Sequence, residues 1–272
     1  MTLESYIKAR RSAIDKELKG YIISGSRPKR SIYKAMEYAL FPGGKRIRAV
    51  LCLAAYEVFR GDIKRALPAA CAVELVHNFS LVHDDLPAID DDDMRRGKPS
   101  CHKKFGEAMA ILCGDAMMAL AFEVIAKDIK GNEMRDVAIE LSAAIGASGM
   151  VGGQAADIEL SKERTDLPHL EYVSIHKTGK LIAASLKIGA IMAKAGKADI
   201  MRIFRFGEYL GLVFQIVDDI LDRDGYAELF GIKGARAEAV RLCAIAEKEI
   251  SKFGAGARIL NDISLSLLNR TA

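Results

Sequence analysis

The chain has 272 residues, half of them apolar, and a formal net charge of +4 at pH 7. This composition suits a large buried core, and the even spread of its basic residues argues against a dedicated nucleic-acid-binding protein. Five scattered cysteines without a C-x-x-C pair argue against a disulfide framework or a zinc site. The N-terminus is charged and amphipathic, and Asp115 and Lys187 interrupt the longest apolar runs. We therefore expect a cytosolic protein without a signal peptide or membrane insertion.

Apolar residues recur at three- and four-residue intervals almost throughout, which predicts an all-α protein. Several stretches, such as 66–82 and 205–221, are apolar nearly all round, as is typical of helices at the centre of a bundle. We find no repeat, low-complexity tract or linker, and we expect a single domain over 1–272. The predicted helices, separated by turns such as Ser24-Gly25-Ser26, Pro42-Gly43-Gly44 and Lys130-Gly131-Asn132, cover residues 3–20, 30–41, 46–60, 66–86, 105–128, 133–155, 168–194, 197–223, 226–253 and 256–269.

A dense acidic cluster follows the fourth of these helices, in LVHDDLPAIDDDDMRRGKPS (81–100). Asp84 and Asp85 fall at the helix end, because Pro87 cannot continue the helix. Four further aspartates, 90–93, lie in the loop that follows and can fold back towards the first pair. Taken alone, such a run would be a solvated acidic loop.

A second acidic cluster, QIVDDILD (215–222), argues against a solvated loop as the explanation of the first. Asp218 and Asp222 share one helix face, Asp219 lies near it, and apolar residues flank all three. Two inward-facing carboxylate groups on separate helices could point at each other across a cavity. Two carboxylates ~4 Å apart cost about 4 kcal/mol at an effective dielectric of 20, which favours a bound cation. Oxygen ligands suit Mg²⁺, Mn²⁺ or Ca²⁺ rather than zinc.

Side chains that could seat an anionic substrate are present, although each has a simpler explanation. The segment PGGKRIR (42–48) places basic residues at a helix start, a natural phosphate site, but exposed basic turns are common. Arg95 and Arg96 match diphosphate oxygens or merely neutralise the acidic loop. His77, two turns before Asp84, is more often a core residue than a ligand. Lys177 and Thr178 are isolated polar residues that open an apolar run.

Together these segments resemble the trans-prenyl diphosphate synthases of the polyprenyl synthetase family, most closely the bacterial-type farnesyl diphosphate synthases. The resemblance covers nearly the whole chain and implies an isoprenoid-synthase-type helical bundle around a deep central cavity, usually homodimeric. The segments that carry it, in chain order, are GGKRIR (43–48), ELVHNFSLVHDDLPAIDDDDMRRGKPSCHKKFGEAMAILCGDA (74–116), GMVGGQAADIE (149–159), HKTGKLI (176–182) and LGLVFQIVDDILD (210–222).

The resemblance implies that isopentenyl diphosphate is condensed head-to-tail with dimethylallyl or geranyl diphosphate to give (2E,6E)-farnesyl diphosphate. About three Mg²⁺ ions, with Mn²⁺ as a substitute, would stabilise charge on the leaving diphosphate. Their implied ligands are Asp84, Asp85, Asp90, Asp218, Asp219 and Asp222. Arg95 and Lys177 would contact the same diphosphate. Isopentenyl diphosphate would be held by Lys45, Arg48, His77 and Arg96. Thr178 and Gln215 would face the allylic cation.

The resemblance also bears on product length and on the loop after the second motif. Phe79, five residues before Asp84, would close the tunnel at fifteen carbons, or it is merely a core residue. A geranylgeranyl diphosphate synthase is the alternative. Family members usually carry a longer loop with a lysine after the second motif, and here only Arg223, Asp224 and Gly225 precede the next helix. That shortening slightly favours a non-catalytic subunit of a heteromeric prenyl synthase, whereas the intact aspartate motifs count against it.

Two other enzyme classes are weaker alternatives. A terpene cyclase would not need a second, basic substrate site, and its second motif normally has Asn and Ser. A His-Asp metal phosphohydrolase is suggested by His83-Asp84, but it would need further paired histidines, which this sequence does not have.

Overall fold

The computed structural model describes residues 1–23, 31–41, 44–160 and 167–270. In these ranges the chain forms helices, one short hairpin and connecting turns, which confirms the predicted all-α class. The breaks predicted at Ser24–Pro28 and at Pro42-Gly43 lie outside the described residues. The chain divides into two compact units, unit 1 (residues 1–50 and 67–134) and unit 2 (51–66 and 135–272). The expected single domain stays a prediction.

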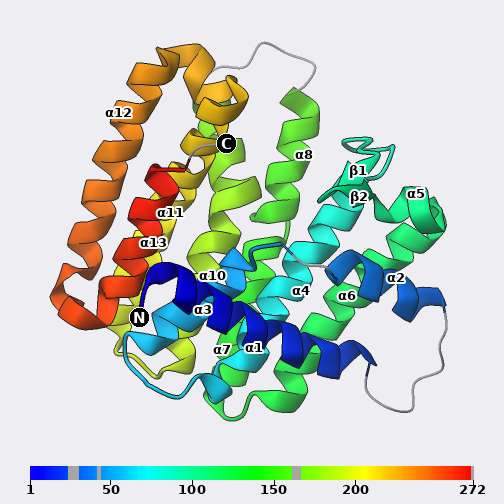
Figure 1. Ribbon diagram of the computed structural model, residues 1–272, viewed down its shortest axis with the longest axis horizontal. Coiled ribbons are helices and arrows are strands. Elements are labelled where there is room, and N and C mark those ends of the chain that lie inside the picture. Colours follow the sequence, from blue (N-terminus) through cyan, green and yellow to red (C-terminus); the bar gives the residue numbers. More distant parts are fainter. Residues whose placement is uncertain (24–30, 42–43, 161–166, 271–272) are drawn as a thin grey trace. The chain divides into compact units, whose positions relative to one another are not determined.

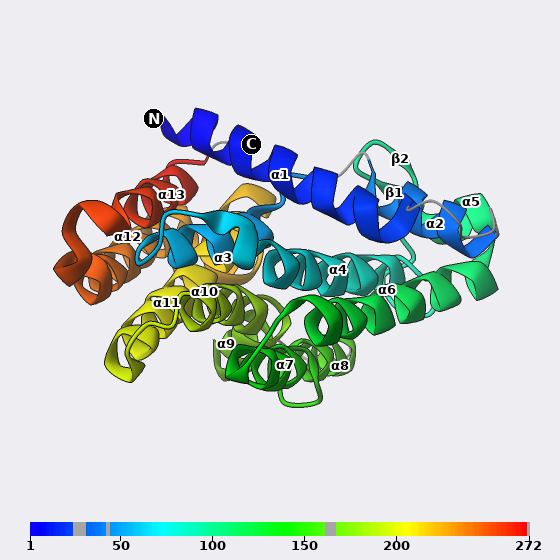
Figure 2. The ribbon, with the colours of Figure 1, turned by 90° about the horizontal axis from the view of Figure 1, so that it is seen from below.

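Unit 1 is built around helix α4, which is buried on almost every side. Every residue from Pro68 to Val76 is buried, as the all-round apolar pattern predicts. Helix α4 packs along α6 and against α1 (Figure 2). The elements of this unit are α1 (Leu3–Ile23), α2 (Ser31–Leu40), the first turn of α3 (Ile47–Glu57), α4 (Leu67–Asp84), β1 (Met94–Arg95), β2 (Lys98–Pro99), α5 (Cys101–Phe105), α6 (Glu107–Asp128) and the start of α7 (Asn132–Ile145).

The hairpin β1–β2 directly follows the acidic loop. Met94 pairs with Pro99 and Arg95 pairs with Lys98 in an antiparallel register. The two turn residues, Arg96 and Gly97, both have positive φ, 54° and 76°. This is the backbone that a two-residue hairpin turn needs, because it matches the right-handed twist of the strands. The periodicity of the sequence did not predict the hairpin, since four strand residues are too few to show an alternation.

Unit 2 has helix α11 at its centre, with α10 and α12 packed against it (Figure 1). Val213, Ile216 and Val217 of α11 share a buried cluster with residues of α12. The elements of this unit are the rest of α3 and of α7, η1 (Ile63–Arg65), α8 (Met150–Leu160), α9 (Leu167–Val173), η2 (Ser174–Gly179), α10 (Lys180–Met192), α11 (Lys197–Asp222), α12 (Gly225–Ile250), η3 (Ser251–Ala257) and α13 (Arg258–Leu268).

Three predicted helices of unit 2 are divided in the structure, and one of them, 226–253, is interrupted at Gly231, whose φ of 68° and ψ of 157° are not helical. The prediction of one helix over 133–155 was wrong: α7 ends at Ile145 and α8 begins at Met150. Gly146, Ser148 and Gly149 lie between them, and glycine and serine favour turns over helix interiors. The expected helix 168–194 is interrupted by η2, a π-helical segment at Ser174–Gly179. Such segments are rare and occur often at functional sites.

Helix α11 approaches η2 very closely, and a glycine makes this possible. A Cβ added at Gly211 would lie 2.6 Å from the Cα of Gly179. No larger residue fits here without moving one of the two backbones. Because Gly211 is one turn before Gln215, this contact sets the distance between Gln215 and the residues of η2.

Candidate active site

The first aspartate motif is positioned by the end of α4 and by a loop that folds back on it. Asp84 is the last residue of α4, and Asp85 follows it as a buried residue. The backbone N–H of Asp90 donates to the carbonyl oxygen of Asp84 at 2.9 Å. This hydrogen bond returns Asp90 to the helix end, as expected from the break at Pro87. Three predicted metal ligands are therefore assembled within unit 1.

Arg95 supplies the positive charge next to this motif. Its Nε donates to Oδ1 of Asp85 at 2.8 Å, and its Nη2 contacts both Asp85 and, at 2.8 Å, Asp92. Burial raises the pKa of Asp85, and the hydrogen bond and charge of Arg95 oppose that rise. Arg95 thus holds a buried carboxylate in place for a metal ion, and its guanidinium group could also contact a diphosphate.

The predicted basic group gathers beside the preceding turns of α4, with His77 on α4 itself, Arg48 on α3 and Arg96 in the turn of the hairpin. Nη1 of Arg48 lies 3.3 Å from Nε2 of His77, and Nη1 of Arg96 donates to Oδ1 of Asn78 at 3.4 Å. A small cavity of about 30 Å³ has both Arg96 and Asp85 in its lining, together with Asn78 and Arg95. The acidic motif and part of the basic group therefore meet at one cavity of unit 1.

His77 is neutral in this environment. Burial, followed by the charges of Arg48 and Arg96, lowers its pKa well below the usual value of 6.5. A guanidinium group can only donate, so Nε2 accepts from Arg48 and the ring proton sits on Nδ1. The neutral ring orients Arg48 and adds no positive charge to those of Arg48 and Arg96.

The two other basic residues of PGGKRIR, Arg46 and Lys45, differ in burial. Arg46, with a side chain that is fully buried, donates to Asp15 at 2.9 Å, to Glu74 at 3.0 Å and to the Leu40 carbonyl at 2.6 Å. These partners bind helices α1, α2 and α4 together. Lys45 is exposed, and its role towards the substrate stays a prediction.

The second aspartate motif lies on the last turns of α11, in unit 2. Oδ1 of Asp218 accepts from Nη1 of Arg270 at 2.6 Å. Asp219 is buried and accepts from Nε2 of Gln215 at 2.8 Å and from the Tyr226 backbone N–H at 2.9 Å. Burial raises the pKa of both carboxyl groups. Asp219 thus joins α11 to the start of α12, and Asp222, the last residue of α11, is exposed.

A chain of hydrogen bonds fixes the two residues predicted to face the cation. Oγ1 of Thr178 donates to Oε1 of Gln215 at 3.1 Å. The Gln215 amide cannot turn over without losing its bond to Asp219, so its oxygen stays on the side of Thr178. The neighbouring Lys177 donates to Asp157 of α8 at 2.5 Å. Lys177 and Thr178 both lie in the π-helical segment η2.

Phe79 is buried on α4, 5 % exposed, and its ring meets the His83 ring edge-to-face at 5.8 Å. Its ring therefore packs against the residue that precedes Asp84 on the same helix. This position agrees with a tunnel floor and also with a plain core residue.

The sequence reasoning missed three side-chain partners of the predicted site residues: Asn78, Asp157 and Arg270. Asp157 lies in GGQAADIE, a segment that carried the resemblance without an assigned role. Arg270 is 52 positions from Asp218 and shows no signal in its own neighbourhood.

Comparisons with known proteins identify the class. The model of the family described as "Polyprenyl synthetase" matches residues 29–236. A protein of Fischerella ambigua named dimethylallyltranstransferase is 39 % identical, covering 99 % of this chain and 84 % of its own. A chloroplastic geranylgeranyl pyrophosphate synthase of Catharanthus roseus is 40 % identical, covering 92 % and 76 %. The crystal structure of an FPP/GFPP synthase from Zymomonas mobilis superposes with a TM-score of 0.93 at 37 % identity, covering 98 % of each chain.

The fold is therefore that of the helical isoprenoid synthases, and the chain belongs to the polyprenyl synthetase family. It is a prenyltransferase of the trans-prenyl diphosphate synthase type. The alignment with the Fischerella protein runs over 292 positions, more than the 272 residues of this chain, so that relative has segments that this chain does not have. In this chain, α11 and α12 are joined by Arg223 and Asp224 alone.

Proposed function

We propose that this chain condenses isopentenyl diphosphate with dimethylallyl or geranyl diphosphate and releases (2E,6E)-farnesyl diphosphate. The observation that carries the proposal is the pairing in unit 1 of an acidic motif with a separate basic group. Arg48, His77 and Arg96 accompany Asp84 and Asp85 on and beside one helix. A terpene cyclase has one diphosphate to bind and needs no such second group.

The donor set fits the Mg²⁺ ions that the family uses. Both motifs offer carboxylate oxygens, and a metal ion at Asp85 or Asp218 would share the carboxylate with Arg95 or Arg270 or displace it. Asp84, Asp85, Asp90 and Asp218 are the proposed ligands, and Asp222 lies one helical turn after Asp218. Asp219 is hydrogen-bonded to Gln215 and Tyr226, and so its role is to hold these two residues in place. Bound Mg²⁺ would supply Lewis-acid stabilisation of the leaving diphosphate, and Mn²⁺ would substitute for it. The meeting of the two motifs around one substrate stays a prediction.

The remaining roles belong to side chains of the chain itself. Arg95 and Lys177 neutralise diphosphate oxygens of the allylic substrate, and Lys45, Arg48 and Arg96 do so for isopentenyl diphosphate. Thr178 Oγ1 and Gln215 Oε1 would direct their lone pairs at the positive charge that develops on the allyl carbon. Apolar helix faces exclude water from that cation. By analogy with the family, the departing diphosphate takes the final proton.

Farnesyl length is proposed from Phe79, because an aromatic ring five residues before Asp84 stands about 7.5 Å up the same helix. The named relatives also support a different product, since the Catharanthus protein is a geranylgeranyl pyrophosphate synthase. Geranylgeranyl diphosphate is therefore the second candidate.

The test is to incubate the purified chain with isopentenyl and geranyl diphosphates plus Mg²⁺ and to identify the products by chromatography. We expect a fifteen-carbon diphosphate from the natural chain and products of twenty carbons or more from Phe79→Ala. Phe79→Tyr keeps the ring and should keep the product. A hydrocarbon product would indicate a cyclase, and twenty-carbon product from the natural chain would favour the second candidate.

We also propose that two copies associate through α6. Ile111, Leu112 and Met118 of this helix are exposed apolar side chains. By length and composition alone, α6 could also cross a membrane, with 44 % of its apolar window buried. A subunit interface explains the same pattern in a family whose members are usually homodimers. Light scattering should give twice the chain mass of 29.6 kDa, and a single-chain mass would contradict the proposal. Location in the cytosol stays a prediction.

A further inference from the structure

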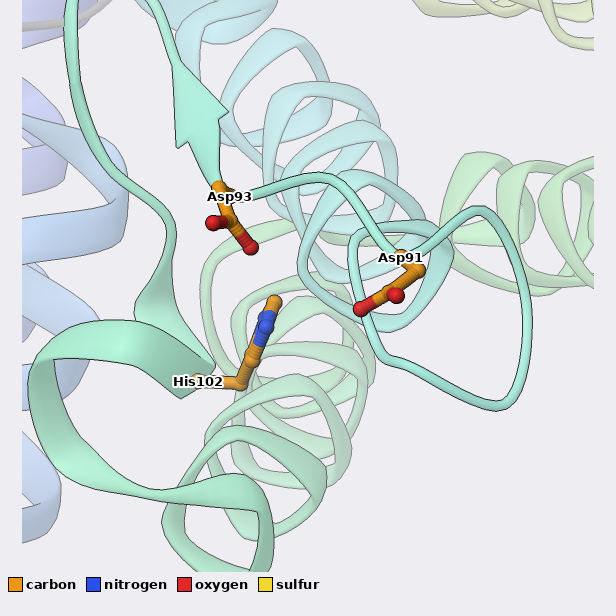
Figure 3. Close-up of side chains that lie close together, drawn as sticks. All are labelled: Asp91, Asp93 and His102. Atoms are coloured by element: carbon orange, nitrogen blue, oxygen red, sulfur yellow. The ribbon is translucent and has the colours of Figure 1, made fainter.

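A second group of potential metal ligands lies beside the first aspartate motif but shares no residue with it. It consists of Asp91, Asp93 and His102, and one ligand atom from each lies within 4.8 Å of the other two (Figure 3). The three side chains converge from the acidic loop and from α5. None of them has a role in the proposed transfer reaction.

The backbone of unit 1 brings these residues together. The Asp91 N–H donates to the Leu86 carbonyl at 3.1 Å, which fixes the loop before the hairpin. The Ser100 N–H donates to the carbonyl of Asp93 at 2.9 Å, at the base of the hairpin. His102 follows two residues later, in the first turn of α5. The arrangement therefore depends on the hairpin that the sequence pattern did not reveal.

His102 carries the second, independent observation. It is 5 % exposed, and its Nε2 is a buried nitrogen without a hydrogen-bond partner in the described structure. Leaving such a group unsatisfied costs about 1–3 kcal/mol, so a buried unpaired nitrogen requires an explanation. The ring is aimed at the two carboxylates (Figure 3). A cation between the nitrogen and the carboxylate oxygens would satisfy it.

The other ring nitrogen has the partner that a metal-binding histidine needs. Nδ1 of His102 lies 3.0 Å from Oγ of the buried Ser100. If Nδ1 donates to this hydroxyl, Nε2 is unprotonated and free to bind a metal. Lys103 pairs with Oδ1 of Asp93 at 2.6 Å, which leaves the second oxygen of Asp93 for a metal.

We propose that Asp91, Asp93 and His102 bind one divalent transition-metal ion, with Zn²⁺ the best fit. One imidazole nitrogen with two carboxylate oxygens suits zinc, whereas Mg²⁺ takes oxygen ligands alone. The absence of a C-x-x-C pair argued against zinc from the sequence, but this set uses no cysteine. The bound ion would tie the loop that carries Asp90 to α5.

The experiment is to titrate Zn²⁺ into the full chain saturated with Mg²⁺, so that the aspartate motifs are already occupied, and to follow binding by calorimetry. We expect one zinc site. His102→Gln and the double variant Asp91→Asn/Asp93→Asn should each weaken it at least tenfold. Ser100→Ala should weaken zinc binding about tenfold, because it removes the hydroxyl group that orients the His102 ring. His176→Gln and Asp136→Asn, which remove one histidine and one carboxylate elsewhere, should leave it unchanged.

Folding of each variant is checked by circular dichroism. Asp91 and Asp93 are exposed, so their double variant should fold even if His102→Gln does not. X-ray absorption of the zinc-loaded chain should show a single imidazole ligand. Zinc binding that is unaffected by the His102 and Asp91/Asp93 variants, or is lost only in Asp84→Asn, would overturn the proposal. So would the absence of any zinc site under these conditions.

Discussion

Asp218 shares its carboxylate with Arg270, a cation that arrives from just beyond α13. Any metal ion that binds Asp218 has to displace this guanidinium group or share the carboxylate with it. Both side chains are partly exposed, 28 % for Asp218 and 38 % for Arg270, so the pair is worth about 0.2–1 kcal/mol.

Arg270→Ala should therefore lower the Mg²⁺ concentration needed for half-maximal activity, by a factor of about 1.5–5 from that pair energy. The measurement is initial rate against Mg²⁺ concentration. Arg241→Ala removes an exposed arginine that is paired with Glu238 and should leave the half-maximal concentration unchanged. If Arg270→Ala instead raises it, Arg270 contacts the substrate and does not compete with the metal.

His77 makes the stability of the chain depend on pH. Its pKa is lowered in the folded chain, while the unfolded chain binds a proton near pH 6.5. Its contribution to stability is therefore complete above about pH 6.5 and is lost as the pH falls below that value.

Because only the unfolded chain binds this proton, we expect the free energy of unfolding to decrease as the pH falls from 6.5 to 5.5. The contribution of His77 to this decrease is at most about 1.4 kcal/mol per pH unit. Urea unfolding at several pH values measures it. His77→Gln should remove most of this slope, and His176→Gln should not. Equal slopes in the natural chain and in His77→Gln would show that His77 is protonated in the fold.

The positions of individual side chains could be predicted where the local sequence determines the course of the backbone. Asp84, Asp85 and Asp90 assemble as expected because a proline ends α4 and the loop returns. Asp157 and Arg270 were not predictable, because their partners are distant in the chain and nothing in their own neighbourhood indicates a charge pair. The neutral state of His77 also depends on Arg96, which the hairpin brings back to α4.

Several long helices followed the apolar periodicity of the sequence. Helices α4, α6 and α11 were placed within a few residues of their observed bounds. The π-helical segment η2 could not be predicted, because its residues continue the helical pattern of their neighbours. Its geometry is supported by packing against α8 and α11. The break between α7 and α8 was signalled by Gly146 and Gly149, which the helical pattern outweighed.

Gly211 is the position where this packing can be tested. A methyl group there would press on Gly179 and separate α11 from η2, which lengthens the contact between Thr178 and Gln215. We expect Gly211→Ala to lose about 1–3 kcal/mol of stability and to lower kcat about 100-fold, the cost of a misplacement near 1 Å.

The control for this variant is Gly20→Ala on α1, where an added Cβ would meet nothing within 4 Å. It should keep its activity and be as stable as the natural chain or more stable, because alanine is the better helix former. Full activity in Gly211→Ala would mean that the hydrogen bond between Thr178 and Gln215 does not position the reacting group.

The two aspartate motifs belong to different units, Asp84 to unit 1 and Asp218 to unit 2. The family relationship predicts that both hold the same metal–diphosphate group, and a double-mutant cycle can test this. If they do, removing either carboxylate removes most of the shared binding energy, and the two effects do not add.

We expect Mg²⁺ plus inorganic diphosphate to raise the melting temperature of the natural chain, because a ligand of the folded state stabilises it. Asp84→Asn and Asp218→Asn should each abolish most of that rise, and the double variant should lose little more. Asp136→Asn should retain it. Two partial losses that sum in the double variant would show two independent sites.

The two-residue connection between Asp222 and Gly225 has a kinetic consequence. A long flap would have to swing away before each product could depart, and would then limit the pace of every cycle. Here Arg223 and Asp224 alone join α11 to α12, and only the short segment before Gly231, whose φ of 68° and ψ of 157° are not helical, is set off from the rest of α12. We then expect ionisation of the allylic diphosphate, and not an opening motion of this segment, to limit the rate of turnover.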